Sequence, residues 1–217
     1  MKFSHSKLEL YKQCPRKFKY RYIDKLPTKP FEHLQKGSEV HRLLEIYGNE
    51  DLKSDIKEAY NIALKFSESE IGKEILSQKS KKELCIKFKD FEPIDSDSND
   101  YDFIGYIDRV NFTNSGLELI DYKTGKYKEP KYQDFQQLII YAIWFFKRYE
   151  KLTQIKIRFV YVEHLQENSI VLTRDKIDDI LNNLKILVKT IELDQDFHKK
   201  PNTLCDWCDF KEHCLND

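Results

Sequence analysis

The sequence lacks several features that would assign it to a common functional class. No apolar run approaches the length of about 20 residues that spans a bilayer, and residues 1–7 lack the apolar stretch of a secretory signal. A Gly-x₄-Gly-Lys-Ser/Thr phosphate loop is also missing, which excludes a motor ATPase of that type. We therefore expect a cytoplasmic protein with no membrane partner and no motor of its own.

The formal net charge of the sequence is zero. The 37 basic residues balance 37 acidic ones, so no global field indicates nucleic acid. The distribution is uneven, however, because basic residues crowd the first 25 positions and acidic residues crowd positions 90–102. A charge run is more often a solvated face, so the basic cluster only supports a phosphate-backbone partner that other features indicate.

The composition is that of a globular protein. With 217 residues, 40% of them hydrophobic, the chain is long enough for one substantial core and a small appended subdomain. Periodicity predicts helices over residues 3–24 (interrupted at Cys14-Pro15), 36–47, 52–76, 132–149 and 175–193. It predicts strands over residues 84–88, 101–112, 117–122 and 155–163. This order of elements indicates an α/β sandwich.

The segments between these elements are expected to be irregular. Pro27 and Pro30 mark a loop, residues 93–100 form an acidic loop, and the tail from Pro201 is irregular. Cys85 falls in an apolar strand pattern, so we expect a small buried side chain there.

The hairpin over residues 103–123 carries two carboxylates and a lysine. With residues 113–116 as the turn, Asp108 is expected across from Asp121, where facing Cβ atoms are about 4.5 to 5.5 Å apart. Because strand side chains alternate, Lys123 shares a face with Asp121. Hard oxygen ligands suit Mg²⁺ or Mn²⁺, and a lysine beside them can offset charge on a phosphate, as in metal-dependent phosphodiesterases. Taken alone, Asp-x-Lys is more often a pair of solvated surface charges.

The cysteines indicate a second metal site. Cys205-x₂-Cys208-x₅-Cys214 lies at the end of the sequence, and thiolates at such spacing select zinc or an iron-sulfur cluster rather than a disulfide in the cytosol. The fourth ligand is open. His213 would complete a zinc site locally, whereas Cys14 would close a cluster across the two ends of the chain.

Six motifs occur in one order along the chain. They are Cys14-Pro15-Arg16-Lys17-Phe18, Gly37-Ser38-Glu39-Val40-His41, Gly105-Tyr106-Ile107-Asp108, Asp121-Tyr122-Lys123, Gln137-x₃-Tyr141 and the cysteine triplet. Together they resemble the RecB-like branch of the PD-(D/E)XK nuclease superfamily, specifically iron-sulfur members such as the AddB nuclease domain and the CRISPR-associated RecB-like exonucleases. The resemblance implies a restriction-endonuclease-like fold, with a central mixed β-sheet flanked by helices.

The resemblance also implies which residues act. The metal ligands would be His41, Asp108, Asp121 and the backbone carbonyl of Tyr122. Lys123 would be the catalytic lysine, and Gln137 and Tyr141, which share a helix face, would position the DNA strand or active-site groups. Cys14, Cys205, Cys208 and Cys214 would bind a [4Fe-4S] cluster. Residues 1–30 and 200–217 would then form an iron-sulfur subdomain of a single nuclease domain spanning residues 1–217.

The implied activity is that of a DNA exonuclease or end-processing nuclease. It would hydrolyse phosphodiester bonds with Mn²⁺ or Mg²⁺, at single-stranded ends or flaps. CRISPR spacer acquisition beside an integrase fits such a chain, and a phage or repair nuclease, alone or with a helicase partner, fits almost as well. Two alternatives have no catalytic role: a nucleic-acid-binding adaptor with silent catalytic residues, and a zinc-stabilised domain using Cys205, Cys208, His213 and Cys214.

Overall fold

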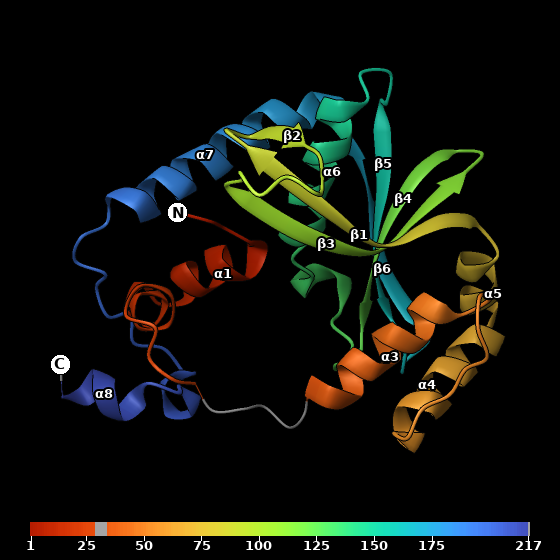
Figure 1. The fold of residues 1–217 in the computed structure, drawn as a ribbon, viewed down its shortest axis with the longest axis horizontal. Helices are drawn as coiled ribbons and strands as arrows, with labels where there is room; N and C mark the ends of the chain where they lie inside the picture. Colours follow the sequence, from red (N-terminus) through yellow and green to blue (C-terminus); the bar gives the residue numbers. More distant parts are fainter. Residues whose placement is uncertain (29–33, 217) are drawn as a thin grey trace. The chain divides into compact units, whose positions relative to one another are not determined.

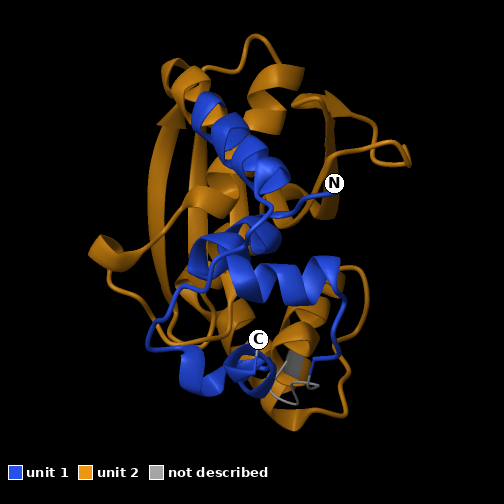
Figure 2. Ribbon diagram, turned by 90° about the vertical axis from the view of Figure 1, so that its left-hand side faces the viewer, with its two compact units in different colours: residues 1–31, 182–217 blue, residues 32–181 orange. Residues whose placement is uncertain are grey.

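The computed structural model describes residues 1–28 and 34–216. Pro30, expected in a loop, and Asp217, the last residue of the expected subdomain, lie outside the described residues. The chain forms two compact units, one made of residues 1–31 and 182–217 and a larger one made of residues 32–181 (Figure 2).

A six-stranded mixed sheet forms the centre of the larger unit (Figure 1). Its strands are β1 (Lys79–Lys89), β2 (Glu92–Ile94), β3 (Phe103–Thr113), β4 (Gly116–Lys123), β5 (Gln154–Tyr161) and β6 (Gln166–Thr173). The order is β2-β1-β3-β4-β5-β6, and every neighbouring pair is antiparallel except β4 and β5. The expected mixed sheet flanked by helices is thus confirmed.

Helices pack on this sheet through apolar side chains. They are α3 (Leu34–Ile46), α4 (Lys57–Glu68), α5 (Glu70–Leu76) and α6 (Gln136–Arg148), with short 3₁₀ turns at Pro130–Tyr132 and Arg174–Lys176. Val40, Leu43 and Phe66 from the first two helices share one buried cluster with Ile120 and Tyr122 of β4. The crossover from β4 to its parallel neighbour β5 contains α6, because parallel strands need a long connection.

The smaller unit brings the two ends of the chain together. Its N-terminal part contains α1 (His5–Gln13), α2 (Pro15–Phe18) and a π-helical turn at Lys19–Ile23; its C-terminal part contains the end of α7 (Ile177–Leu193), a 3₁₀ turn at Cys205–Trp207, and α8 (Lys211–Leu215). The Tyr11 hydroxyl donates to Asp194 at 2.6 Å, and the Phe18 and Phe197 rings stack 6.2 Å apart. These contacts join the two parts, and the iron-sulfur subdomain itself stays a prediction.

Several elements differ from the sequence expectation, and the tail expected to be irregular from Pro201 contains a 3₁₀ turn at Cys205–Trp207 and α8. The helix expected over residues 52–76 is two helices, α4 and α5, because Ser69 ends one and its hydroxyl accepts the Gly72 N–H of the next. The acidic loop begins with the short strand β2, and β6 was not predicted. Cys85 is half-buried rather than buried, because β1 is fully covered only over residues 86–88.

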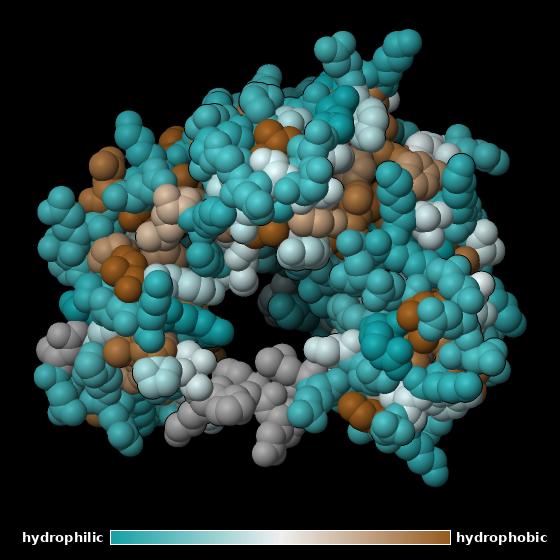
Figure 3. All heavy atoms as spheres, viewed as in Figure 1, coloured by the Kyte–Doolittle hydropathy of each residue, from teal (hydrophilic) through white to brown (hydrophobic). Residues whose placement is uncertain are grey.

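The surface contains no extended apolar face in the view of Figure 3, where hydrophilic residues predominate and apolar ones are scattered. Within the described residues, no helix combines the length and the apolar character needed to cross a membrane.

Arg158 of β5 holds a charge network inside the larger unit. The side chain is 3% exposed, and its guanidinium lies 2.8 Å from Glu74 of α5 and 3.1 Å from Glu118 of β4. It also bonds Glu167 of β6 at 2.7 Å. One buried cation therefore ties α5 to three neighbouring strands.

Arg158→Met should lower the free energy of unfolding by about 3 to 5 kcal/mol, because it leaves the buried Glu118 carboxylate without its main cation. Urea denaturation followed by circular dichroism measures this. The matched control is Arg148→Met, which removes an exposed ion pair with Asp95 and should cost no more than about 1 kcal/mol. Equal losses in the two variants would contradict the assignment.

Candidate active site

The two predicted acids lie where the β3–β4 ladder ends. Thr113 pairs with Gly116, as the expected turn requires, and the ladder runs to Arg109 opposite Ile120. Beyond that pair a side chain replaces the backbone carbonyl as hydrogen-bond acceptor: the Tyr122 N–H donates to Asp108 Oδ2 at 2.7 Å. Asp108 is therefore oriented by the backbone of the strand that carries Asp121.

Asp121 is buried, and Lys123 is the charged partner of its carboxylate. The residue is 5% exposed, and its Oδ2 accepts no hydrogen bond from the described residues. Lys123 Nζ lies 2.5 Å from that oxygen as an ion-pair partner. Burial, followed by the charge of Asp108, raises the pKa of Asp121 to about 6, despite the opposing effects of Lys123 and His41. The site thus favours additional positive charge beside Asp121.

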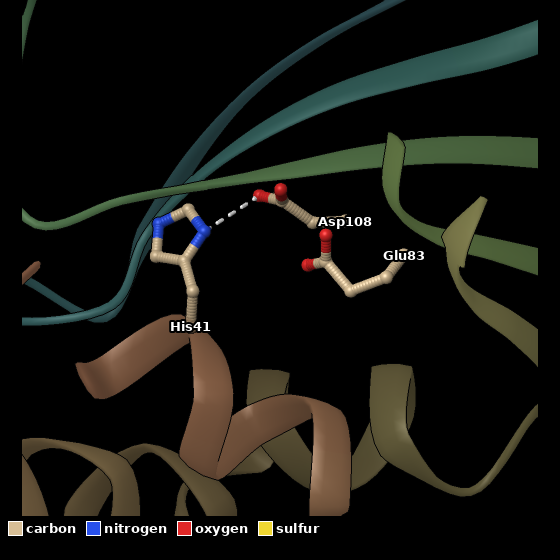
Figure 4. Close-up of side chains that lie close together, drawn as sticks. All are labelled: His41, Glu83 and Asp108. Atoms are coloured by element: carbon tan, nitrogen blue, oxygen red, sulfur yellow. Dashed lines mark ion pairs between the residues drawn. The ribbon is translucent and has the colours of Figure 1, made fainter. Parts of the chain in front are cut away.

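His41 reaches the acids from α3. Its Nδ1 lies 3.3 Å from Asp108 Oδ2 (Figure 4). Burial opposes protonation of the ring, but Asp108 raises the pKa of His41 overall. Gly37 stands one helical turn earlier, and a Cβ there would lie 2.9 Å from Thr124 Oγ1. The glycine therefore allows α3 to approach the end of β4.

Lys123 is fixed by several neighbours. Its Nζ donates to Gln137 Oε1 of α6 at 3.3 Å and lies 4.7 Å from the centre of the Phe159 ring. The predicted partnership of Gln137 with the site thus takes the form of a contact with the lysine. The ammonium is held between Asp121 and α6.

Tyr141 packs directly on the backbone of β3. A Cβ at Gly105 would lie 2.4 Å from Tyr141 Cε1, so only glycine leaves room for the ring. Burial raises the pKa of Tyr141 to about 12, from an ordinary 10.0. The Tyr141 ring therefore packs against β3 at Gly105, which lies three residues before Asp108.

Glu83 of β1 also lies in the site, although no sequence pattern predicted it. Lys82 pairs with Arg109 and Leu84 with Ile107, but Glu83 makes no ladder pair between them. Ligand atoms of His41, Glu83 and Asp108 all lie within 4.8 Å of one another (Figure 4). Burial and the charges of Asp108 and Glu45 raise the pKa of Glu83 to about 7. In the sequence, Glu83 follows two lysines just before the predicted strand and looks like a surface charge.

These residues suit a hard divalent cation. Carboxylate oxygens and an imidazole nitrogen are ligands of Mg²⁺ and Mn²⁺, and the mutually close ligand atoms of His41, Glu83 and Asp108, with the buried Asp121 carboxylate, provide such donors. The role of the Tyr122 carbonyl as a ligand stays a prediction.

The four predicted cluster cysteines surround one cavity in the smaller unit. The cavity measures about 340 Å³, and Cys14, Cys205, Cys208 and Cys214 all line it. Among the described residues, no three of their sulfur atoms lie within 4.8 Å of one another. The Asn202 N–H donates to Cys205 Sγ at 3.3 Å, whereas the His213 ring packs edge-on against Tyr20 and is not among the lining residues.

Comparison with known proteins assigns the family. The PD-(D/E)XK nuclease superfamily matches residues 2–215. The chain belongs to this superfamily. Its fold is similar to the crystal structure of a candidate exonuclease from Eubacterium rectale, with 14% identity, a TM-score of 0.53, and coverage of 95% of this chain and 92% of the other. The structure of SSO0001 has 15% identity, a TM-score of 0.48, and coverage of 98% and 85%. No curated protein matches the sequence.

The superfamily signature can be located in this PD-(D/E)XK chain. Ile107-Asp108 stands where the name has Pro-Asp, and Asp121-Tyr122-Lys123 supplies the acid, the variable residue and the lysine. Either carboxylate can bind a cation, so aspartate in place of glutamate keeps the same donor chemistry.

The raised pKa of Asp121 predicts how the stability of the metal-free protein depends on pH. Its pKa is about 6 in the folded chain against an ordinary 3.8, so the folded state holds this proton more tightly and stability falls as pH rises between those values. The shift corresponds to about 2 to 3 kcal/mol. Asp121→Asn should therefore raise the melting temperature at about pH 7.5 and change it little near pH 4.

Thermal melts in excess chelator at the two pH values test this. Asp97→Asn, in the exposed acidic loop, is the control and should leave both melting temperatures unchanged. A lower melting temperature for Asp121→Asn at the higher pH would contradict the prediction.

Proposed function

We propose that this PD-(D/E)XK superfamily member is a metal-dependent deoxyribonuclease of the RecB-like type that degrades or trims DNA from its ends. The observation that carries the proposal is the buried Asp121 carboxylate, which has Lys123 as its charged partner and lies close to the charge of the Asp108–His41 pair. Such an arrangement is costly without a cation and useful with one.

The contacts of each residue suggest a separate role for it in the proposed reaction. A divalent cation held by His41, Asp108 and Asp121 would polarise the scissile phosphate and activate water. Lys123, beside Asp121, would offset negative charge that develops on the phosphate. Gln137 would position the ammonium, because it already accepts a hydrogen bond from Lys123 Nζ.

The substrate we propose is single-stranded DNA at ends or flaps. The RecB-like motif order supports this class, and exposed lysines follow the site along the chain: Lys126, Lys128 and Lys131. Lysines so placed can neutralise successive phosphates without reading sequence. As a cellular role we propose end trimming before CRISPR spacer acquisition beside an integrase, with phage or repair processing as the alternative; gene neighbours distinguish them.

Lys123→Ala should reduce cleavage of an end-labelled single strand in Mn²⁺ by about 100-fold or more, because it removes charge stabilisation of the transition state. A time course of the degradation ladder measures the rate and shows whether digestion starts at an end. Lys151→Ala, an exposed lysine in the turn before β5, is the matched control and should retain most of the activity.

Several outcomes would contradict the proposal. If the wild-type protein still cleaves DNA in excess chelator, the mechanism is not metal-dependent. If Lys123→Ala cleaves DNA as fast as the wild-type protein, Lys123 does not have the assigned catalytic role. DNA binding by the wild type without any cleavage in Mn²⁺ or Mg²⁺ would favour the non-catalytic adaptor.

For the smaller unit we propose a [4Fe-4S] cluster bound by Cys14, Cys205, Cys208 and Cys214. All four line one cavity, and a backbone N–H already points at Cys205 Sγ, as is common around cluster sulfurs. Cys14 lines this cavity and His213 does not, which favours the four-cysteine set over the zinc set.

Protein purified without oxygen should be brown, with a broad absorption near about 400 nm from sulfur-to-iron charge transfer. Cys208→Ser should lose most of that absorption, whereas Cys85→Ser, which removes a thiol outside the cavity, should keep it. A colourless wild type that contains zinc by elemental analysis would show that the cysteines bind zinc.

A further inference from the structure

Glu83 has an unusual backbone for its place in the fold. Its φ is +46°, in the left-handed region that residues with a Cβ disfavour. The other non-glycine residues with positive φ among those described lie outside strands: Lys25, Asp90, Phe91, Leu165 and Phe197. Glu83 instead interrupts β1 between residues that pair normally with β3 on both sides.

The interruption leaves the Glu83 carboxylate among the site residues. A ligand atom of Glu83 lies within 4.8 Å of those of His41 and Asp108, and Figure 4 shows its carboxylate beside Asp108. The Glu83 carboxylate makes no hydrogen bond or ion pair with another described residue. Two carboxylates are therefore held close together, and both the His41 ring and the Tyr122 N–H, which contact Asp108, can share their charge.

A second observation points to a bound cation rather than to a chance cluster of acids. Asp121 is more than nine-tenths buried, and its Oδ2 accepts no hydrogen bond from the described residues. Lys123 provides one positive charge for it. Three carboxylates thus surround the site, while the nearby cations are one lysine and, when protonated, one histidine.

We propose that Glu83 is a further protein ligand of the divalent cation, in addition to His41, Asp108 and Asp121. This inference rests on the proposed metal-dependent function and adds a ligand to that site. Three carboxylates provide enough oxygen donors and negative charge to bind Mn²⁺ before DNA arrives. The chain should therefore bind Mn²⁺ without DNA, and Glu83 should contribute to that affinity.

Calorimetric titration of the metal-free full chain with Mn²⁺, in the absence of DNA, tests the proposal. Glu83→Gln keeps the size of the side chain but removes its charge, and it should weaken Mn²⁺ binding by about 10-fold or more. Glu45→Gln is the matched control, because Glu45 influences Glu83 only through its charge and is not in the group of mutually close ligand atoms. It should bind within about twofold of wild type.

A second variant, Glu83→Gly, distinguishes the loss of a metal ligand from a folding defect. Glycine accepts positive φ without strain, so the melting temperature of this metal-free variant should not fall, while its Mn²⁺ affinity should drop as far as that of Glu83→Gln. Wild-type affinity in either folded variant would overturn this inference and leave the proposed nuclease intact. A wild-type chain that binds no Mn²⁺ would overturn both.

Discussion

The geometry of the candidate active site depends on one hydrogen bond, from the Tyr122 N–H to Asp108 Oδ2. It forms where the backbone ladder between β3 and β4 stops, so a side chain completes the pairing that a carbonyl makes elsewhere. Because Asp108 is held by β4, its carboxylate cannot move away from Asp121 without losing a charge-assisted bond. The mutual repulsion of the two acids is thereby maintained, and a cation is the direct way to relieve it.

The same point in β3 marks a change in what the strand packs against. Gly105 faces Tyr141 of α6, whereas Arg109 and Asn111, further along the same alternation, bond to carbonyls at the end of α5. Asp108 lies between these two regions. The acids are therefore carried by strands that are packed on both sides of the site, which limits their freedom and keeps their spacing. Glycines at 37 and 105 allow the close approaches that this packing needs.

Much of this arrangement could be predicted from the sequence because it follows local rules. The hairpin turn was predicted by Asn114, Ser115 and Gly116, and Gly116 indeed has a φ of +125°. The facing of Asp108 and Asp121 followed from that turn. The strand β6 was missed because its exposed residues outnumber its buried ones, so it lacks the apolar alternation that identifies strands. Glu83 was missed for a different reason: periodicity assumes regular strand backbone, and a left-handed residue breaks that assumption without leaving a compositional mark.

The two units differ in the metals that their donors prefer. The larger unit offers carboxylates and an imidazole, which suit hard dications, while the smaller unit offers four thiols around one cavity. A hard ion such as Mn²⁺ prefers the carboxylates to the thiols, whereas thiolates are the ligands that hold iron-sulfur clusters. All residues of the proposed catalytic site come from residues 32–181, and all four cysteines come from the other unit. The two proposed metal sites therefore differ in donor chemistry and lie in different units, so the proposed catalysis and the proposed cluster can be tested separately.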